Sequence, residues 1–230
     1  MKDLLQPRPL SVSIGITTKC NLRCSYCHKA DPVLEERPVA NMDMDAETIR
    51  KLYRYCKDHN VRRVTLSTGG ETTFRSDWIA CVTPFVEDPD IHTFMVTNFA
   101  RVLSDEELSV LARFDALQVS FDSADLEMVR ALRSKADLRT IGYNISRLKQ
   151  RGREIGRTPD LQVNCTLCRS NIDHVGKLAG YCLQLGVDTL LITEEMVIRE
   201  GFNDQPDTVD KLNAMARTAD PNSATAQFFI

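Results

Sequence analysis

The sequence lacks the features that would carry a protein into or across a membrane. No apolar run approaches the roughly 20 residues that span a bilayer. Residues 1–7 contain no signal-peptide core. The net charge of −3 over 230 residues is too small to indicate a surface for nucleic acid or for an anionic membrane. We therefore expect a cytoplasmic protein with neither of these partners, in a compartment where thiols stay reduced.

Internal repeats and low-complexity segments are also missing, and what remains is an alternation of β-branched runs with helical patterns. With 43% hydrophobic and 27% charged residues, the chain suffices for one α/β domain or slightly more. The alternation predicts parallel βαβ units with right-handed crossovers. The expected strands cover residues 11–18, 61–68, 92–98, 116–122, 161–169 and 189–193. The expected helices cover residues 45–59, 76–87, 104–114, 138–151 and 174–185.

Three helix boundaries carry local signals. Ser104 precedes three acidic residues, a pattern typical of an N-cap followed by charges that the helix dipole favours. Gly152 and Gly186 stand where the helices before them are expected to end. After the last expected strand, a sixth helix is expected over residues 207–218, followed by a tail.

Polar residues follow the expected strands, and parallel α/β folds build their sites at the carboxyl ends of strands. In the fourth strand Gln118, Ser120 and Asp122 share one face, while apolar residues take the other. A barrel strand with polar side chains toward its mouth has this pattern. The other strand ends lead into Cys20, Glu71, Asn98 and Arg169.

Three of the eight cysteines, Cys20, Cys24 and Cys27, form a C-x3-C-x2-C pattern directly after the first strand. A four-iron cubane normally takes four thiolates. With three, one iron keeps an open position that can bind and activate a substrate, as in catalytic metal sites. Lys19 and Arg23 would partly offset the negative charge of the thiolates.

Tyr26 stands directly before the last of these cysteines, and Gly69-Gly70-Glu71 directly follows the second strand. With these motifs the sequence resembles the radical S-adenosylmethionine (SAM) superfamily over roughly residues 11–195. The resemblance implies a partial TIM-type (βα)6 barrel with parallel strands. It also implies that Cys20, Cys24 and Cys27 hold a [4Fe-4S] cluster whose open iron binds the methionine part of SAM. The further SAM contacts that it implies are Tyr26, Gly69, Gly70, Glu71, Asn98, Ser120, Asp122 and Arg169.

The family's chemistry is expected to follow from these cofactors. A flavodoxin or ferredoxin-type donor would deliver one electron, and SAM would be cleaved to methionine and a 5′-deoxyadenosyl radical that abstracts hydrogen from a substrate. A peptide and a small molecule both remain open as the substrate. Two positions depart from the family pattern: Thr72 stands where proline is common, and Arg169 falls on the helix-facing side of a regularly alternating strand.

The spelling of the cysteine motif is most similar to the SPASM and twitch types of this family, which carry extra clusters in a C-terminal extension. The chain ends without a second cysteine cluster. We expect residues 1–196 to form the core barrel and residues 197–230 to form a helix and tail. Residues 226–230 read as the opening of another strand, which favours a truncated extension over a single-cluster enzyme.

Other interpretations of the same cysteines remain. Cys24 to His28 match the C-x-x-C-H attachment signature of c-type haem. A non-catalytic structural zinc site would use Cys20, Cys24, Cys27 and His28. Elsewhere, Cys56, Cys81 and Cys182 are expected to be core residues. Cys165 and Cys168 lie three positions apart on a strand and should point to opposite faces. Asp122 and Asp125 could cap the next turn instead of contacting a ligand.

Overall fold

The computed structural model describes residues 10–27, 41–194 and 226–228. Its centre is a sheet of seven strands that are all parallel to their neighbours. The strands follow one another across the sheet in chain order, as in the winding of a TIM barrel. They are β1 (Ser11–Ser13), β3 (Arg63–Thr65), β4 (His92–Thr97), β5 (Ala116–Ser120), β7 (Asp160–Leu167), β8 (Thr189–Glu194) and β9 (Ala226–Phe228).

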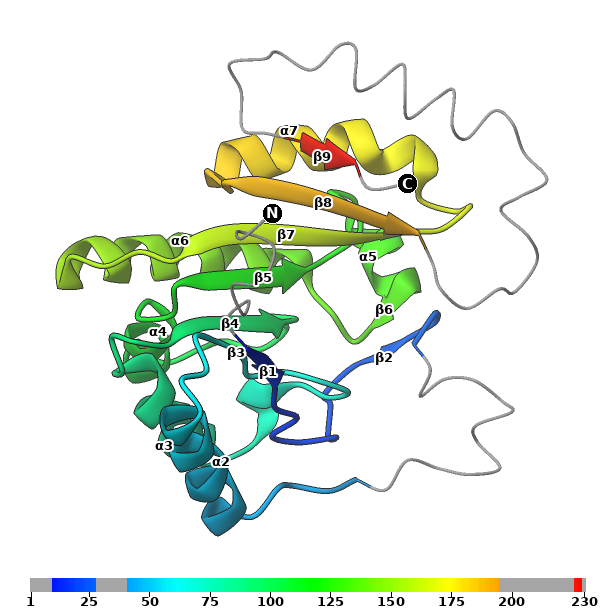
Figure 1. Ribbon diagram of the computed structural model, residues 1–230. Coiled ribbons are helices and arrows are strands. Elements are labelled where there is room, and N and C mark those ends of the chain that lie inside the picture. The colour runs from blue at the N-terminus through cyan, green and yellow to red at the C-terminus, as the bar shows by residue number, and fades with distance from the viewer. Residues whose placement is uncertain (1–9, 28–40, 195–225, 229–230) are drawn as a thin grey trace, which may run out of the picture.

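In the described part of the chain the sheet has two edges, β1 and β9, so it forms a partial rather than a closed barrel. Helices alternate with the strands along the chain, and Figure 1 shows the strand arrowheads pointing toward the side where β2 and β6 lie. The predicted parallel α/β partial barrel is thus confirmed. The helices are α2 (Ala46–Asp58), α3 (Trp78–Val86), α4 (Asp105–Leu111), α5 (Leu126–Leu132), α6 (Leu138–Ile155) and α7 (Val175–Leu185).

Apolar periodicity places the core between the sheet and its helices. Along β7 every second residue is buried, beginning with Leu161 and ending with Leu167. Phe121, Leu117 and Met95 are among the largest fully buried side chains. The three cysteines expected in the core, Cys56, Cys81 and Cys182, are confirmed as buried.

Local capping explains where several helices begin. The Ser104 hydroxyl accepts the Glu107 amide, and the Glu107 carboxylate accepts the Ser104 amide, which completes a capping box at α4. The Asp125 side chain accepts the Met128 amide and starts α5, so its predicted capping role is confirmed. The helical length of α5 was not expected from the sequence, which indicated only a short turn there.

The expected end of α6 at Gly152 was wrong. The helix runs through Gly152 to Ile155, and Gly156 ends it in the left-handed conformation at φ 70°. Gly152 is needed for packing, because a Cβ there would lie 2.9 Å from the carbonyl oxygen of Arg157. Gly186 does end α7, as predicted.

Two short elements were not foreseen. β2 (Arg23–Cys24) and β6 (Arg133–Ser134) form a separate antiparallel pair beside the carboxyl ends of the sheet (Figure 1). The strand expected over residues 226–230 is present as β9 and extends the parallel sheet beyond β8. The helix expected over residues 207–218 lies outside the described residues.

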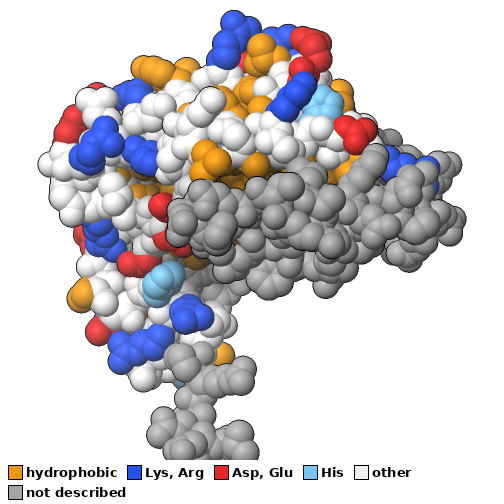
Figure 2. All heavy atoms as spheres, turned by 90° about the horizontal axis from the view of Figure 1, so that it is seen from above, with side chains coloured by type: hydrophobic (Ala, Val, Ile, Leu, Met, Phe, Trp, Pro, Cys, Tyr) orange, Lys and Arg blue, Asp and Glu red, His pale blue; other side chains and the backbone are white. Residues whose placement is uncertain are grey.

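Among the described residues, no helix is long and apolar enough to span a membrane. On the face seen from above, Lys and Arg side chains are interspersed with Asp and Glu side chains (Figure 2). This mixed surface agrees with the small net charge of the chain.

Candidate active site

The three clustered cysteines lie in the loop that follows β1, and all three are partly exposed. Cys24 belongs to β2 and is paired with Arg133 of β6, and the Ser25 amide donates to the Leu132 carbonyl at 2.9 Å. The Cys27 amide donates to the Cys24 carbonyl at 3.1 Å. The middle of the cysteine loop is therefore fixed to the segment after α5.

The thiols are close enough to influence one another. Burial raises the pKa of the Cys24 thiol to about 11, while the Arg133 guanidinium acts in the opposite direction. The charges of Asp122, Cys27 and Cys20 add to the increase. Cys24 thus shares its surroundings with both other thiols.

A cavity of about 310 Å³ opens beside this loop, at the carboxyl ends of β3, β4 and β5. Cys20 and Cys24 border the cavity together with the loop after β3. The position agrees with the general location of sites in parallel α/β folds. The cavity is lined by Cys20, Leu22, Cys24, Ser67, Thr68, Gly69, Gly70, Glu71, Val96, Thr97, Asn98, Ser120 and Arg133.

The two glycines of the loop after β3 allow its close approach to the cysteine loop. Gly69 has a φ of 69°, in the left-handed region. A Cβ on Gly70 would lie 2.4 Å from the Thr17 carbonyl oxygen and 2.6 Å from that of Lys19. The Glu71 amide donates to the same Lys19 oxygen at 2.8 Å. The backbone of this segment therefore packs directly on the chain that leads into Cys20.

The Glu71 carboxylate is 3% exposed and binds groups of the protein itself. It accepts hydrogen bonds from the Thr97 hydroxyl at 2.8 Å and from the Asn98 amide at 2.7 Å. It also accepts from the hydroxyl and the amide of Thr73. Thr72, which replaces the family's common proline, donates its hydroxyl to the Leu66 carbonyl. Because the carboxylate is occupied, backbone groups of the segment are the better candidates for contacts to a ligand.

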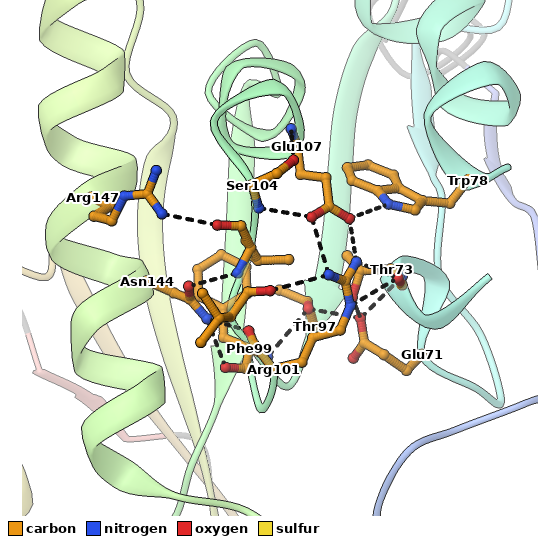
Figure 3. A network of polar contacts seen from close by, with 12 residues as sticks. Glu71, Thr73, Trp78, Thr97, Phe99, Arg101, Ser104, Glu107, Asn144 and Arg147 are labelled. Atoms are coloured by element: carbon orange, nitrogen blue, oxygen red, sulfur yellow. Dashed lines mark hydrogen bonds and ion pairs between the residues drawn. The ribbon is translucent and has the colours of Figure 1, made fainter. Parts of the chain in front are cut away.

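A polar network connects Glu71 through Thr73 and Arg101 to Glu107 (Figure 3). The Thr73 carbonyl accepts two hydrogen bonds from Arg101, which forms an ion pair with Glu107. Glu107 also accepts the Trp78 indole N–H at 3.0 Å. Burial raises the pKa of Glu107, but these hydrogen bonds outweigh it and hold the pKa at about 2.

Asp122 and Tyr26 are not part of the cavity lining and contact each other. Asp122 is 0% exposed, and its carboxylate accepts from Arg133 Nε at 2.7 Å and Nη2 at 2.9 Å. It also accepts the Tyr26 hydroxyl at 2.7 Å and the Thr166 amide at 2.9 Å. Asp122 is not part of the cavity lining and forms a buried ion pair, while its expected contact with SAM stays a prediction. The N-cap of α5 is Asp125, so the capping role expected for Asp122 is wrong for this helix.

The remaining expected residues separate into two groups. Asn98 and Ser120 line the cavity, and the Asn98 amide group donates to the Asn21 side chain at 2.8 Å. Arg169 is exposed and lies outside the cavity lining. Cys165 and Cys168 are both buried, because β7 ends at Leu167 and the alternation of faces stops there.

Sequence reasoning missed Arg133, as well as Ser67, Thr68 and Thr97 of the cavity wall. The alternation of β3 and β4 could have indicated the wall residues. Arg133 carries no local signal, since its place opposite Cys24 depends on a pairing across 109 positions.

The donor set fits an iron–sulfur cluster. Thiolates are the preferred ligands of such clusters, and Cys20 and Cys24 border a cavity large enough for a ligand of the open iron. Within residues 10–27, 41–194 and 226–228, no three His, Cys, Asp or Glu side chains converge on one metal ion. A cubane spaces its ligands more widely than a single zinc ion does. His28, the fourth ligand of the zinc and haem alternatives, lies outside the described residues.

Comparisons with known proteins match this geometry. The family model described as "Radical SAM superfamily" matches residues 14–163. A curated protein of Methanococcus maripaludis, named "Probable GTP 3',8-cyclase", is 29% identical over 195 residues, which are 81% of this chain and 59% of that protein. The chain therefore spans less than two thirds of that relative.

Solved structures share the fold. Streptococcus suis SuiB bound to its precursor peptide SuiA has a TM-score of 0.73 and 17% identity, with 99% of this chain and 50% of that chain covered. SuiB bound to S-adenosylmethionine has a TM-score of 0.71 and 17% identity, with 96% and 47% covered. At this identity the likeness establishes the fold alone.

Proposed function

Because the chain belongs to the radical SAM superfamily, we propose that Cys20, Cys24 and Cys27 hold a [4Fe-4S] cluster and that SAM binds in the adjoining cavity. The observation that carries the proposal is the cavity itself. Its walls bring Cys20 and Cys24 together with the backbone of Gly69 and Gly70 at the carboxyl ends of the strands. The cavity therefore offers cysteine side chains for the cluster, polar backbone groups for SAM, and space for SAM beside the cluster.

When bound, the reduced cluster and SAM supply a 5′-deoxyadenosyl radical that abstracts hydrogen from a substrate. The chain holds and orients these partners. Gly69 and Gly70 offer backbone groups for the amino end of SAM, and Ser120 and Asn98 offer polar side chains from β5 and the end of β4. Leu22 and Val96 provide apolar wall that limits water in the cavity.

For the substrate we propose a small molecule, with GTP as the first compound to test. Support comes from the name of the 29% identical curated relative, whereas the peptide-bound structure is related only at the level of fold. A flavodoxin or ferredoxin-type protein is the proposed electron donor. GTP and a precursor peptide are distinguished by which of them increases deoxyadenosine formation over the substrate-free rate.

The test of the cofactor proposal is anaerobic reconstitution with iron and sulfide, followed by metal analysis and a dithionite assay for 5′-deoxyadenosine. We expect about four irons per chain and deoxyadenosine formation, both lost in Cys20→Ala, Cys24→Ala and Cys27→Ala. Cys56→Ala on α2, 1% exposed and outside the cavity, is the matched control that keeps both. Tightly held zinc, or a haem spectrum, in place of iron and sulfide would overturn the proposal.

A further inference from the structure

Arg133 contacts both a cysteine of the proposed cluster loop and a buried carboxylate. Its Nη1 lies 3.9 Å from the Cys24 sulfur, while Nε and Nη2 bind the two oxygens of Asp122. Its guanidinium carbon lies 5.3 Å from the centroid of the Tyr26 ring. With a side-chain exposure of 7%, Arg133 is a buried cation held in one orientation from several sides.

The pairing of β2 with β6 fixes this arrangement. Cys24 and Arg133 are register partners, and the Ser25 amide donates to the Leu132 carbonyl beside them. The planar guanidinium presents a forked edge to Asp122 and leaves Nη1 for the sulfur. Arg133 contacts the Cys24 sulfur, whereas the Asp122 oxygens bind Arg133, Tyr26 and Thr166, so the cation is the member of the ion pair that meets the cysteine.

A cation beside a cluster ligand stabilises the more negative oxidation state, and burial strengthens the effect by lowering the local dielectric. Hydrogen bonds to ligand sulfurs and local charge are established determinants of cluster potentials. We propose that Arg133, oriented by Asp122, raises the reduction potential of the cluster by donating to the Cys24 thiolate, and so acts as a positioning residue for electron uptake. This inference rests on the proposed function.

The main test is a double variant, because removal of one partner of a buried ion pair leaves an uncompensated charge and can unfold the protein. The double variant Arg133→Gln/Asp122→Asn removes both charges and keeps groups that can hydrogen-bond. Asp122→Asn alone keeps the cation and removes the charge that offsets it. Arg133→Lys keeps the charge and loses the fork. The control is Arg101→Gln/Glu107→Gln, which neutralises another partly buried ion pair that contacts no cysteine.

Each reconstituted protein is titrated with mediators and dithionite in the absence of SAM, and the reduced cluster is followed by electron paramagnetic resonance. We expect a more negative midpoint potential for the double variant and a less negative one for Asp122→Asn. Arg133→Lys should stay closer to the wild type than the double variant does, and the control should not shift. The opposite signs of the first two shifts cannot arise from a general loosening of the fold.

The outcomes separate this inference from the proposed function. If the wild-type protein binds no cluster, the proposed function is wrong, and the inference is wrong with it. Variants that carry four irons per chain but share the wild-type potential would overturn the inference alone. Loss of the cluster from Arg133→Lys together with a wild-type melting temperature would also overturn it, since Arg133 would then be needed for cluster binding rather than for potential.

Discussion

The carboxylate of Glu71 accepts the backbone amide of Asn98 at 2.7 Å, which ties the loop after β3 to the end of β4. Both segments line the cavity, and the Asn98 side chain reaches across to Asn21 of the cysteine loop. The Glu71 carboxylate and the Asn98 side chain together connect three loops at the mouth of the barrel. The position of the proposed SAM wall depends on this connection.

Glu71→Gln should weaken this connection, because the amide side chain has one acceptor oxygen and presents an N–H₂ group to existing donors. Hydrogen bonds to a charged group are worth about 1.5–3 kcal/mol, so we expect a loss of about 2–3 kcal/mol in the free energy of unfolding. Urea denaturation of the apoprotein measures it. Glu87→Gln removes an exposed carboxylate in a surface ion pair and should change stability by less than about 1 kcal/mol. Equal effects of the two substitutions would contradict this role.

Glu107 should make the protein acid-sensitive in a defined range. Its pKa is lowered from 4.5 to about 2 in the folded protein, so its contribution to stability is present above pH 4.5 and is lost as the pH falls toward 2. Because the side chain is only partly buried, we expect about 2–3 kcal/mol. The difference in unfolding free energy between wild type and Glu107→Gln should be full at pH 6 and should shrink toward zero near pH 2.

The control for this pH dependence is Glu106→Gln, an exposed neighbour in the first turn of the same helix. Its unfolding free energy should follow that of the wild type at every pH. A wild-type advantage over Glu107→Gln that stays constant from pH 6 to pH 2 would show that the Glu107 charge is not responsible.

Gly70→Ala should separate the two walls of the cavity. The added Cβ would overlap the carbonyl oxygens of Thr17 and Lys19, which are backbone atoms and cannot move aside as a side chain can. We expect lower iron retention after desalting and a lower melting temperature. Gly180→Ala on α7 meets no atom within 4 Å and should stabilise the protein by up to about 1 kcal/mol. Wild-type iron content and melting in Gly70→Ala would refute the close packing.

Ser120→Ala should weaken SAM binding without affecting the cluster. Ser120 is the one residue of β5 in the cavity lining, and its hydroxyl is the proposed SAM contact. Loss of a hydrogen bond worth about 0.5–1.5 kcal/mol predicts a roughly threefold to tenfold higher Kd, measured by equilibrium dialysis on reconstituted protein. Ser146→Ala, whose hydroxyl bonds within α6, should bind SAM as the wild type does. An unchanged Kd in Ser120→Ala would remove this residue from the proposed site.

Much of the fold follows from local signals in the sequence. The period of β7, the capping box at Ser104 and the glycine after α7 are each specified by a few consecutive residues. Gly152 shows the limit of such signals. The residue type alone does not distinguish a glycine that ends a helix from a glycine that allows another segment to pack closely against it. The close packing of Arg157 and Thr158 against Gly152 distinguishes the two cases.

The cysteine triplet and the Gly69-Gly70 turn are visible in the sequence, because they depend on short spacing. The handedness of βαβ units then predicts the order of strands that brings both to one edge. The contact of Arg133 with Cys24 across 109 positions and the ion pair of Arg133 with Asp122 became visible only in the folded protein. The physical reason is that a buried charge requires a partner. That partner is supplied by whichever element packs against it, and no local pattern encodes its identity.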